Sequence, residues 1–226
     1  MKCLVTGGTG FLGGHLVEAL AKRGEQVRVL ARPGSKTEHI DQLGIEIIQG
    51  DLGDIPSLKK ATRDVEFIYH CAALAADWGS WEDFEKINVV GTRNLLQAAV
   101  EGAVNKFIHI STTDVYGYPN SRVDETAPFR FRGWPYGDTK IKAEQSVWDY
   151  HRQHGLPVTV VRPLNIYGPL AVKSRPLLTR MAVELVGTDQ GFSIEKAQKE
   201  LNYTPKVDFE NGMQLVENWL KRIGII

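Results

Sequence analysis

Tyr136 and Lys140 are the two residues of this sequence whose types and spacing most directly suggest chemistry. They lie four positions apart in a segment with a helical pattern, so both side chains belong to one helix face. An ammonium beside a phenol favours the phenolate and lowers the tyrosine pKa from about 10 toward neutrality. Such a tyrosine could exchange a proton with a hydroxyl or carbonyl oxygen. The same spacing also occurs by chance on amphipathic helices, so the surrounding elements decide its meaning.

A phosphate-binding loop is predicted at the start of the chain. Gly7, Gly10 and Gly13 form a G-x-x-G-x-x-G pattern between an expected strand at 3–6 and an expected helix at 11–23. Glycine allows a tight turn and lets backbone amides approach a pyrophosphate, which the helix N-terminus also favours. We therefore expect Gly7, Gly10, Phe11, Leu12 and Gly13 to bind a dinucleotide.

The residues after the second and third strands bear on the choice of cofactor. Arg32 follows the second strand, where an acidic residue would favour NAD and an arginine favours the 2′-phosphate of NADP. NADP is therefore expected, with NAD left open. Asp51 and Leu52 follow the third strand, and Asp51 could either accept a hydrogen bond from the adenine amino group or cap the next helix.

Short apolar runs alternate with helical patterns over the first two-thirds of the chain. Strands are expected at 3–6, 26–31, 45–49, 66–71, 106–111 and 157–162, and helices near 11–23, 55–62, 83–102 and 135–154. Strands apolar on both faces, each followed by an amphipathic helix, predict an α/β fold with a doubly wound parallel sheet of the Rossmann type. We expect a dinucleotide-binding domain at 1–168 and a small, truncated C-terminal remnant of a substrate domain at 169–226, with helices near 194–201 and 209–222.

Composition narrows the range of partners and compartments. Lysine plus arginine equals aspartate plus glutamate at 27 each, so no basic excess supports a nucleic-acid or anionic-membrane partner. No apolar run approaches the roughly 20 residues that span a bilayer, and the first residues are needed as a strand rather than a signal peptide. Cys3 and Cys71 lie in strand-like runs, which favours a reducing compartment and hence the cytoplasm. No cluster of residues has metal-ligand spacing, and His70 and His109 are expected to be packed and hydrogen-bonded in strands.

Several motifs in order give the sequence a resemblance to a known family. They are the glycine loop, Asp51, His70–Ala73, Asn88–Thr92, Ser111–Gly117, Tyr136 with Lys140, and Arg162–Pro169. The sequence resembles the extended short-chain dehydrogenase/reductase family, in its NAD(P)-dependent epimerase/dehydratase group. It is also similar to the branch of 3β-hydroxysteroid dehydrogenases and dihydroflavonol reductases. The resemblance covers almost the whole chain.

The resemblance implies roles for individual residues. Thr112 would hydrogen-bond the substrate oxygen, Tyr136 would exchange its proton, and Lys140 would hold the nicotinamide ribose and tune Tyr136. The further positions implied to lie at the cofactor are Ala72, Ala73, Asn88 and Pro163. Asn165 matches an asparagine that contacts the substrate diphosphate in sugar-nucleotide members, and Asp114 is a second candidate for substrate binding.

The sequence departs from the family pattern in two places. Sugar-nucleotide 4,6-dehydratases carry an Asp-Glu pair after the catalytic threonine, whereas this chain has Thr113 and Asp114, which argues against that dehydration. Only Leu170–Ser174 separates the Tyr-Gly-Pro motif from a C-terminal signature resembled by Arg175–Arg180, so we infer an internal deletion that removes much of the substrate lid.

These observations lead to two hypotheses. The first is an NAD(P)-dependent oxidoreductase that moves a hydride between nicotinamide and a carbinol or ketone carbon of a hydroxy-ketone, a sterol-like compound or a nucleotide sugar. The alternative is a catalytically impaired NADP-binding sensor or assembly protein. The resemblance also implies a homodimer built from the helices that contain Leu95 and Tyr136.

Overall fold

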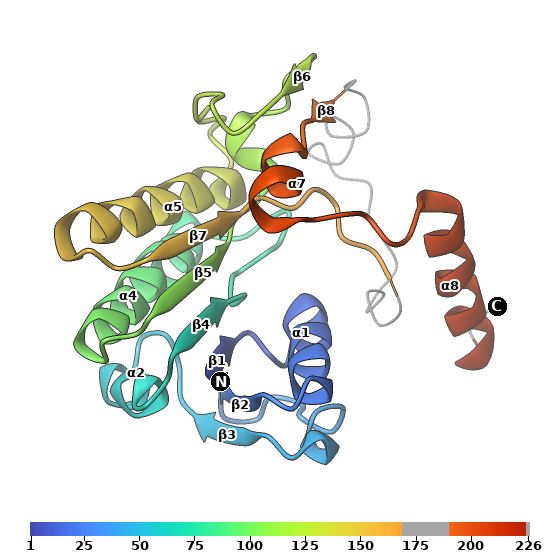
Figure 1. Ribbon diagram of the computed structural model, residues 1–226. Helices are drawn as coiled ribbons and strands as arrows, with labels where there is room; N and C mark the ends of the chain where they lie inside the picture. Colours follow the sequence, from blue (N-terminus) through green and yellow to red (C-terminus); the bar gives the residue numbers. More distant parts are fainter. Residues whose placement is uncertain (169–189, 225–226) are drawn as a thin grey trace. The chain divides into compact units, whose positions relative to one another are not determined.

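The architecture is taken from a computed structural model, which describes residues 1–168 and 190–224 (Figure 1). These residues form two compact units. Unit 1 comprises Met1–Gly117 and Arg130–Pro163, and unit 2 comprises Tyr118–Phe129 and Leu164–Ile226. The grouping differs from a single division after residue 168, because the segment Tyr118–Phe129 is assigned with the C-terminal part. The expected domain division stays a prediction.

Unit 1 is built on a parallel sheet of six strands in the order β3-β2-β1-β4-β5-β7. The strands are β1 (Lys2–Thr6), β2 (Gln26–Ala31), β3 (Glu46–Gln49), β4 (Phe67–His70), β5 (Lys106–Ile110) and β7 (Val158–Val161). The order turns back at β1, so the crevice at the carboxyl ends of β1 and β4 is the switch point where ligands bind in such sheets. The expected Rossmann-type fold is confirmed, and the predicted strands differ from the observed ones by one residue at some ends.

Both faces of the sheet are covered, which explains why the strands are rich in apolar residues. Leu4 of β1 packs in one hydrophobic cluster, whereas its neighbours Cys3 and Val5 pack in the other. The first cluster includes residues of α2 (Ile55–Thr62), α4 (Gly91–Glu101) and α5 (Pro135–His154), and the second includes residues of α1 (Phe11–Lys22). Alternate side chains of one strand are therefore buried on opposite faces, as a doubly wound sheet requires.

One expected helix has an irregular start. The segment predicted as a helix over 83–102 begins with a short α3 (Trp81–Phe84), continues as a π-helix, η2 (Glu85–Val90), and then becomes α4. π-Turns are uncommon and occur often at functional sites. This one contains Asn88, whose side chain is buried. Two short 3₁₀ turns, η1 (Asp41–Leu43) and η3 (Thr113–Tyr116), have no counterpart in the predicted elements.

Unit 2 contains short elements. β6 (Arg122–Val123) pairs in parallel with β8 (Gly191–Phe192), and α7 (Glu195–Leu201) and α8 (Phe209–Arg222) follow, close to their expected positions. Asp208 caps α8 by accepting a hydrogen bond from the Asn211 amide at 2.8 Å. The expected signature at Arg175–Arg180 and the inferred deletion around 170–174 lie outside the described residues. Within the described part of the chain, no helix combines the length and apolarity needed to cross a bilayer.

Candidate active site

The glycine loop lies between β1 and α1, as predicted, and its conformation explains the glycines. Gly7 has φ +71°, and a Cβ there would lie 2.7 Å from the backbone nitrogen of Ala72. A Cβ on Gly13 would overlap the Gly7 carbonyl oxygen, and that carbonyl accepts the Gly10 amide at 2.9 Å. A side chain at Gly7 or Gly13 would therefore push the loop away from the end of β4 or from the first turn of α1.

The first turn of α1 presents backbone amides without a competing side chain. Gly10 is the N-cap of the helix and makes no side-chain capping bond, and Phe11 and Leu12 are the first helical residues. Amides at a helix N-terminus attract anions through their unpaired N–H groups and the helix dipole. The loop thus combines a tight backbone that only glycine fits with a helix N-terminus that has no side-chain cap, and both features suit a dinucleotide pyrophosphate.

The ends of β2 and β3 lie beside this loop in the sheet order. Arg32 follows β2 and its side chain is exposed. Asp51 accepts the Gly53 amide at 2.9 Å, while α2 is capped by Asp54, so the alternative that Asp51 caps that helix is wrong. The Leu52 side chain is buried in the core under the helices and its carbonyl accepts the Asn94 side-chain amide at 2.9 Å, so its contact with a cofactor stays a prediction.

A series of buried hydrogen bonds ties the end of β1, next to the glycine loop, to the start of α4. The Thr6 hydroxyl lies 2.7 Å from Nδ1 of His70, and Nε2 of His70 lies 2.9 Å from the Thr92 hydroxyl. The Thr6 hydroxyl also accepts the Ala72 amide at 3.3 Å. Burial lowers the pKa of His70 to about 3, so the ring is neutral. These hydrogen bonds fix the backbone after β4, where Ala72 and Ala73 are predicted to approach the cofactor.

Asn88 supports the same loop through its side-chain amide. Its Oδ1 accepts the Leu74 amide at 2.8 Å, and its Nδ2 donates to the Leu74 carbonyl at 3.1 Å. Nδ2 also donates to the Thr139 hydroxyl of α5 at 3.1 Å. Asn88 therefore joins the β4 loop to the helix that carries Tyr136 and Lys140. A direct contact of Asn88 with a cofactor stays a prediction.

The start of α5 is fixed from both sides. Pro135 occupies the first helical position, where a missing N–H costs nothing. The buried Asp138 carboxylate accepts the amides of Arg132 and Gly133, each at 2.9 Å. This clamp sets the direction of the first turn, on which Tyr136 lies. Asp138 went unnoticed in the sequence because an acidic residue in a first helical turn is common.

Lys140 is fully buried at the carboxyl ends of the central strands. Its Nζ donates to the Ile110 carbonyl at 2.6 Å and lies 3.4 Å from Nε2 of His109. Burial lowers the pKa of the amine to about 8, and the charges of Glu144 and Cys71 oppose that shift. Because Ile110 ends β5 and Cys71 follows β4, the amine belongs to the same crevice as the glycine loop.

The structure corrects the expectation for the Tyr136 pKa. Burial raises it to about 12, the Asp114 charge adds to the increase, and a hydrogen bond with Thr112 opposes it. The lowering by Lys140 that the i, i+4 spacing predicted is therefore wrong for this structure. The reason is that the lysine amine is engaged at the end of β5, and removal of the phenol from water dominates.

Thr112 and Asp114 complete the group around the phenol. The Thr112 hydroxyl caps η3 by accepting the Asp114 amide at 3.2 Å, which leaves its hydrogen available for donation. Thr112 acts on both neighbours, because it lowers the pKa of the Tyr136 phenol and of the Asp114 carboxyl against the increase that burial causes. Burial raises the pKa of Asp114 to about 6, Thr112 opposes the shift, and Asp77 adds to it. The structure thus brings Thr112, Asp114 and Tyr136 together.

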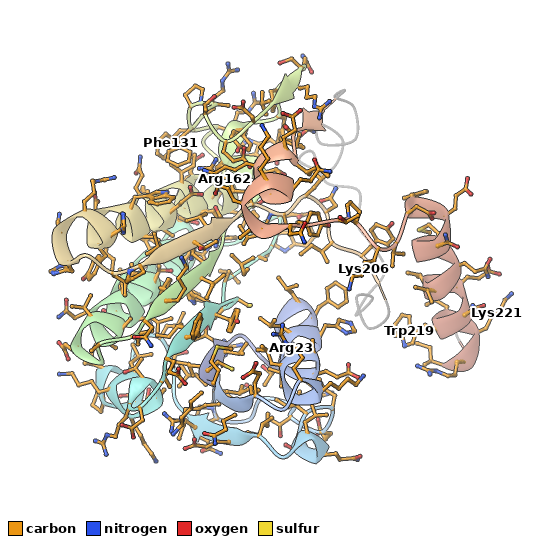
Figure 2. All side chains as sticks on the ribbon, in the orientation of Figure 1. Arg23, Phe131, Arg162, Lys206, Trp219 and Lys221 are labelled. Atoms are coloured by element: carbon orange, nitrogen blue, oxygen red, sulfur yellow. The ribbon has the colours of Figure 1, made fainter. Side chains whose placement is uncertain are left out.

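A second buried network holds β5 against α5 behind the site. The Glu144 carboxylate is fully buried and accepts hydrogen bonds from Ser111 at 2.7 Å and from Nε of Arg162 at 3.1 Å. Arg162, at the end of β7 (Figure 2), also donates to the Tyr116 hydroxyl at 2.6 Å. These contacts fix the strand end on which Thr112 lies. Glu144 was not among the site residues predicted from the sequence, although it lies four residues after Lys140 on the same helix face.

The two remaining candidates lie after β7. The Pro163 carbonyl accepts the Thr113 amide at 3.1 Å, which places Pro163 next to η3. Asn165 is exposed and belongs to unit 2, so its predicted contact with a substrate diphosphate stays a prediction.

Replacing Asp114 with asparagine should stabilise the protein at neutral pH. The pKa of Asp114 is about 6 in the folded state and 3.8 for an ordinary aspartate, so the free energy of unfolding falls as the pH rises between these values. Above pH 6 the native charge costs at most about 3 kcal/mol, and we expect Asp114→Asn to recover about 1–3 kcal/mol. Urea unfolding at pH 4 and pH 7 measures this. Asp149→Asn, at an exposed aspartate of α5, is the control. An Asp114→Asn variant no more stable than the parent at pH 7 would contradict the burial argument.

Comparisons with known proteins agree with this geometry. The model of the NAD dependent epimerase/dehydratase family matches residues 3–188. A 4-hydroxy-2-methyl-3-oxo-4-farnesyl-3,4-dihydroquinoline-1-oxide ketoreductase from Stigmatella aurantiaca is 36% identical over 173 residues, which cover 74% of this chain and 51% of the relative. Sterol demethylase protein B from Methylococcus capsulatus is 39% identical over 174 residues, covering 75% of this chain and 52% of the relative.

A solved structure is also similar over nearly the whole chain. The UDP-glucuronic acid 4-epimerase from Bacillus cereus, in complex with NAD, superposes with a TM-score of 0.80 at 25% identity and covers 98% of this chain and 97% of that one. The chain spans about half the length of the curated relatives it matches. The glycine loop, the Thr112–Tyr136–Lys140 group and the family model lead to one conclusion: the chain belongs to the NAD dependent epimerase/dehydratase family.

Proposed function

We propose that this protein is an NAD(P)-dependent oxidoreductase of the extended short-chain dehydrogenase type, acting on a carbinol or ketone carbon of a small molecule. The observation that carries the proposal is the burial of the Lys140 amine against the Ile110 carbonyl at the end of β5, on the helix that also carries Tyr136 and beside the strand end that carries Thr112. A hydroxyl, a phenol and an amine at this edge of a dinucleotide-binding sheet are the groups that a hydroxyl-to-carbonyl conversion uses.

Each part of the site has a role in this proposal. The amides of the loop from Gly7 to Gly13 hold the pyrophosphate, and the carboxyl ends of β1 and β4 provide the crevice. A bound nicotinamide supplies or accepts the hydride. Thr112 orients the substrate oxygen, Tyr136 donates or accepts its proton, and Lys140 supports the ribose and the phenol.

The raised Tyr136 pKa favours the reducing direction. With a pKa of about 12, the phenol keeps its proton at neutral pH, so it can protonate the oxygen of a carbonyl that is being reduced. The names of two relatives, a quinoline-oxide ketoreductase and a sterol demethylase protein, support a hydrophobic ketone or sterol-like substrate. The name of the similar solved structure supports a nucleotide sugar, for which Asn165 would be a substrate contact.

Binding and turnover, measured together, test the proposal. Fluorescence titration with NADPH and NADH gives cofactor affinity, and a panel of ketones, sterol-like alcohols and nucleotide sugars gives turnover. Binding with turnover on any of these classes supports an oxidoreductase. Tight binding without turnover on the whole panel would overturn it in favour of an NADP-binding sensor or assembly protein.

We expect Arg32 to select NADP. It is exposed after β2, where a guanidinium can pair with the 2′-phosphate. Arg32→Ala should weaken NADPH binding by about 10- to 100-fold, the effect of one or two lost charge-assisted hydrogen bonds, and change NADH binding little. Arg23→Ala, at an exposed arginine that follows α1 (Figure 2), is the matched control. If Arg32→Ala lost the same affinity for NADPH and for NADH, Arg32 would not select between the two cofactors.

Assembly and location are further parts of the proposal. α4 and α5 contact one another in unit 1, and we propose that a homodimer forms through these helices. Cys3 and Cys71 are both free thiols, which supports a reducing compartment such as the cytoplasm. Light scattering at increasing protein concentration tests the dimer.

A further inference from the structure

His109 is a buried histidine whose hydrogen bonding is incomplete. The ring has no exposed surface, and among the described residues its Nδ1 is the one buried side-chain nitrogen or oxygen without a hydrogen-bond partner. Its Nε2 lies 3.4 Å from Nζ of Lys140. Buried polar groups are nearly always paired, so an unpaired nitrogen beside a catalytic lysine calls for an explanation.

His70 provides a natural comparison inside the same sheet. It is paired with His109 in the register of β4 and β5, and the two ring centroids are 5.4 Å apart. Both nitrogens of His70 have hydroxyl partners, from Thr6 and Thr92. Two histidines in adjacent, equally buried positions therefore differ in one respect, which is that His109 has only Lys140 to bind.

Lys140 determines which nitrogen of His109 carries the proton. A lysine ammonium has three N–H donors and no acceptor, so Nε2 can face it favourably only as an unprotonated acceptor. A neutral His109 then carries its hydrogen on Nδ1, the nitrogen that lacks a partner. Burial lowers the pKa of His109 far below its ordinary value, and the Lys140 charge adds to the effect, so the ring stays neutral. The other titratable groups around the amine are Cys71 and Glu144.

We propose that His109 is a positioning residue for Lys140 that accepts one N–H of the ammonium and, with the Ile110 carbonyl, leaves the third N–H directed at the cofactor crevice. The Ile110 carbonyl takes one donor at 2.6 Å and His109 Nε2 a second at 3.4 Å. The role deepens the proposed function and rests on it. It also assigns the ring hydrogen to the unpaired Nδ1, because Nε2 has to remain an acceptor for Lys140.

The tautomer can be measured without cofactor or substrate. Protein labelled with ¹⁵N-histidine, examined by two-dimensional NMR near pH 7, should show His109 with a protonated Nδ1 and an unprotonated Nε2. His109→Gln identifies the resonances by removing them. In Lys140→Met, which removes the donor, the His109 pattern should shift toward Nε2 protonation, while the His70 pattern should persist. A wild-type His109 protonated on Nε2, or a pattern identical in Lys140→Met, would overturn the proposal whether or not the protein turns over a substrate.

Two variants separate positioning from packing. His109→Phe keeps a ring without an acceptor, whereas His109→Gln keeps a side-chain acceptor. His109→Phe should lower kcat by about 10- to 100-fold, the effect of losing a hydrogen bond to a charged group. His109→Phe should also shift the alkaline limb of the pH profile of kcat to lower pH, because the charged Lys140 amine loses a hydrogen-bond acceptor and its pKa falls. His109→Gln should recover most of kcat and restore the limb. Equal losses in both folded variants, with an unchanged profile, would assign His109 a packing role only. If neither variant folds, the tautomer measurement on the wild type decides.

Discussion

Tyr136→Phe should lower turnover by about 10²- to 10⁴-fold while cofactor affinity changes little, because the substitution removes a proton donor and leaves the ring in place. Burial raises the pKa of Tyr136 to about 12, so the phenol holds its proton at neutral pH. The loss should appear in kcat rather than in KM, since the proton moves only during the chemical step.

Tyr150→Phe is the matched control for this prediction. Tyr150 lies on the same helix, and its hydroxyl bonds Gln97 at 3.3 Å on the outer surface. Both variants should bind the cofactor like the wild type. Turnover should fall in Tyr136→Phe and stay unchanged in Tyr150→Phe. Wild-type turnover in Tyr136→Phe would end the proposed mechanism, whereas loss of cofactor binding in the same variant would show that the phenol acts on the fold of the crevice.

The fold was largely predictable because its signals are local and repeated. Each strand of the sheet reads as an apolar run since both of its faces are covered, and each helix that follows has an apolar stripe. The elements that escaped prediction are short or irregular: the π-turn around Asn88, the 3₁₀ turn at Thr113–Tyr116, and the paired strands β6 and β8. Two-residue strands and single irregular turns carry too few residues to show a period.

The sequence was sufficient to name candidate residues of the site, but it was not sufficient to predict their pKa values. Spacing and position after a strand indicated Thr112, Tyr136 and Lys140, and in the structure Thr112 acts on the pKa of Tyr136. The direction of the Tyr136 pKa shift could not follow from an i, i+4 spacing. The direction of the shift depends on how far the phenol is removed from water and on which group the Lys140 amine binds. In this structure the amine binds the Ile110 carbonyl at the end of β5.

The partners that hold the site in place were also invisible in the sequence. Glu144 and His109 belong to elements that had been predicted, yet their roles depend on contacts between α5 and β5, and Asp138 depends on the loop just before its own helix. Glu144 is bonded to Ser111 and Arg162, which lie 33 and 18 positions away. A hydrogen bond over that separation has no signature in a single sequence.

Gly7→Ala should lower dinucleotide affinity by at least about 100-fold and destabilise the protein by about 2–4 kcal/mol. Two costs add up. The residue has φ +71°, which is unfavourable for alanine, and the new Cβ would lie 2.7 Å from the Ala72 backbone nitrogen. Backbone cannot rotate away as a flexible side chain can, so the loop must separate from the end of β4, and the amides of α1 must move with it.

Gly24→Ala separates these two costs. Gly24 follows α1 with φ +76°, nearly the same conformation as Gly7, but a Cβ there meets nothing within 4 Å. It should therefore show only the conformational penalty, about 1 kcal/mol in urea unfolding, and bind NADPH like the wild type. If the two variants were equally stable and bound NADPH equally well, the contact between the loop and β4 would not matter for the site. A loss confined to Gly7→Ala would instead show that close backbone packing at the sheet's switch point holds the pyrophosphate amides in place.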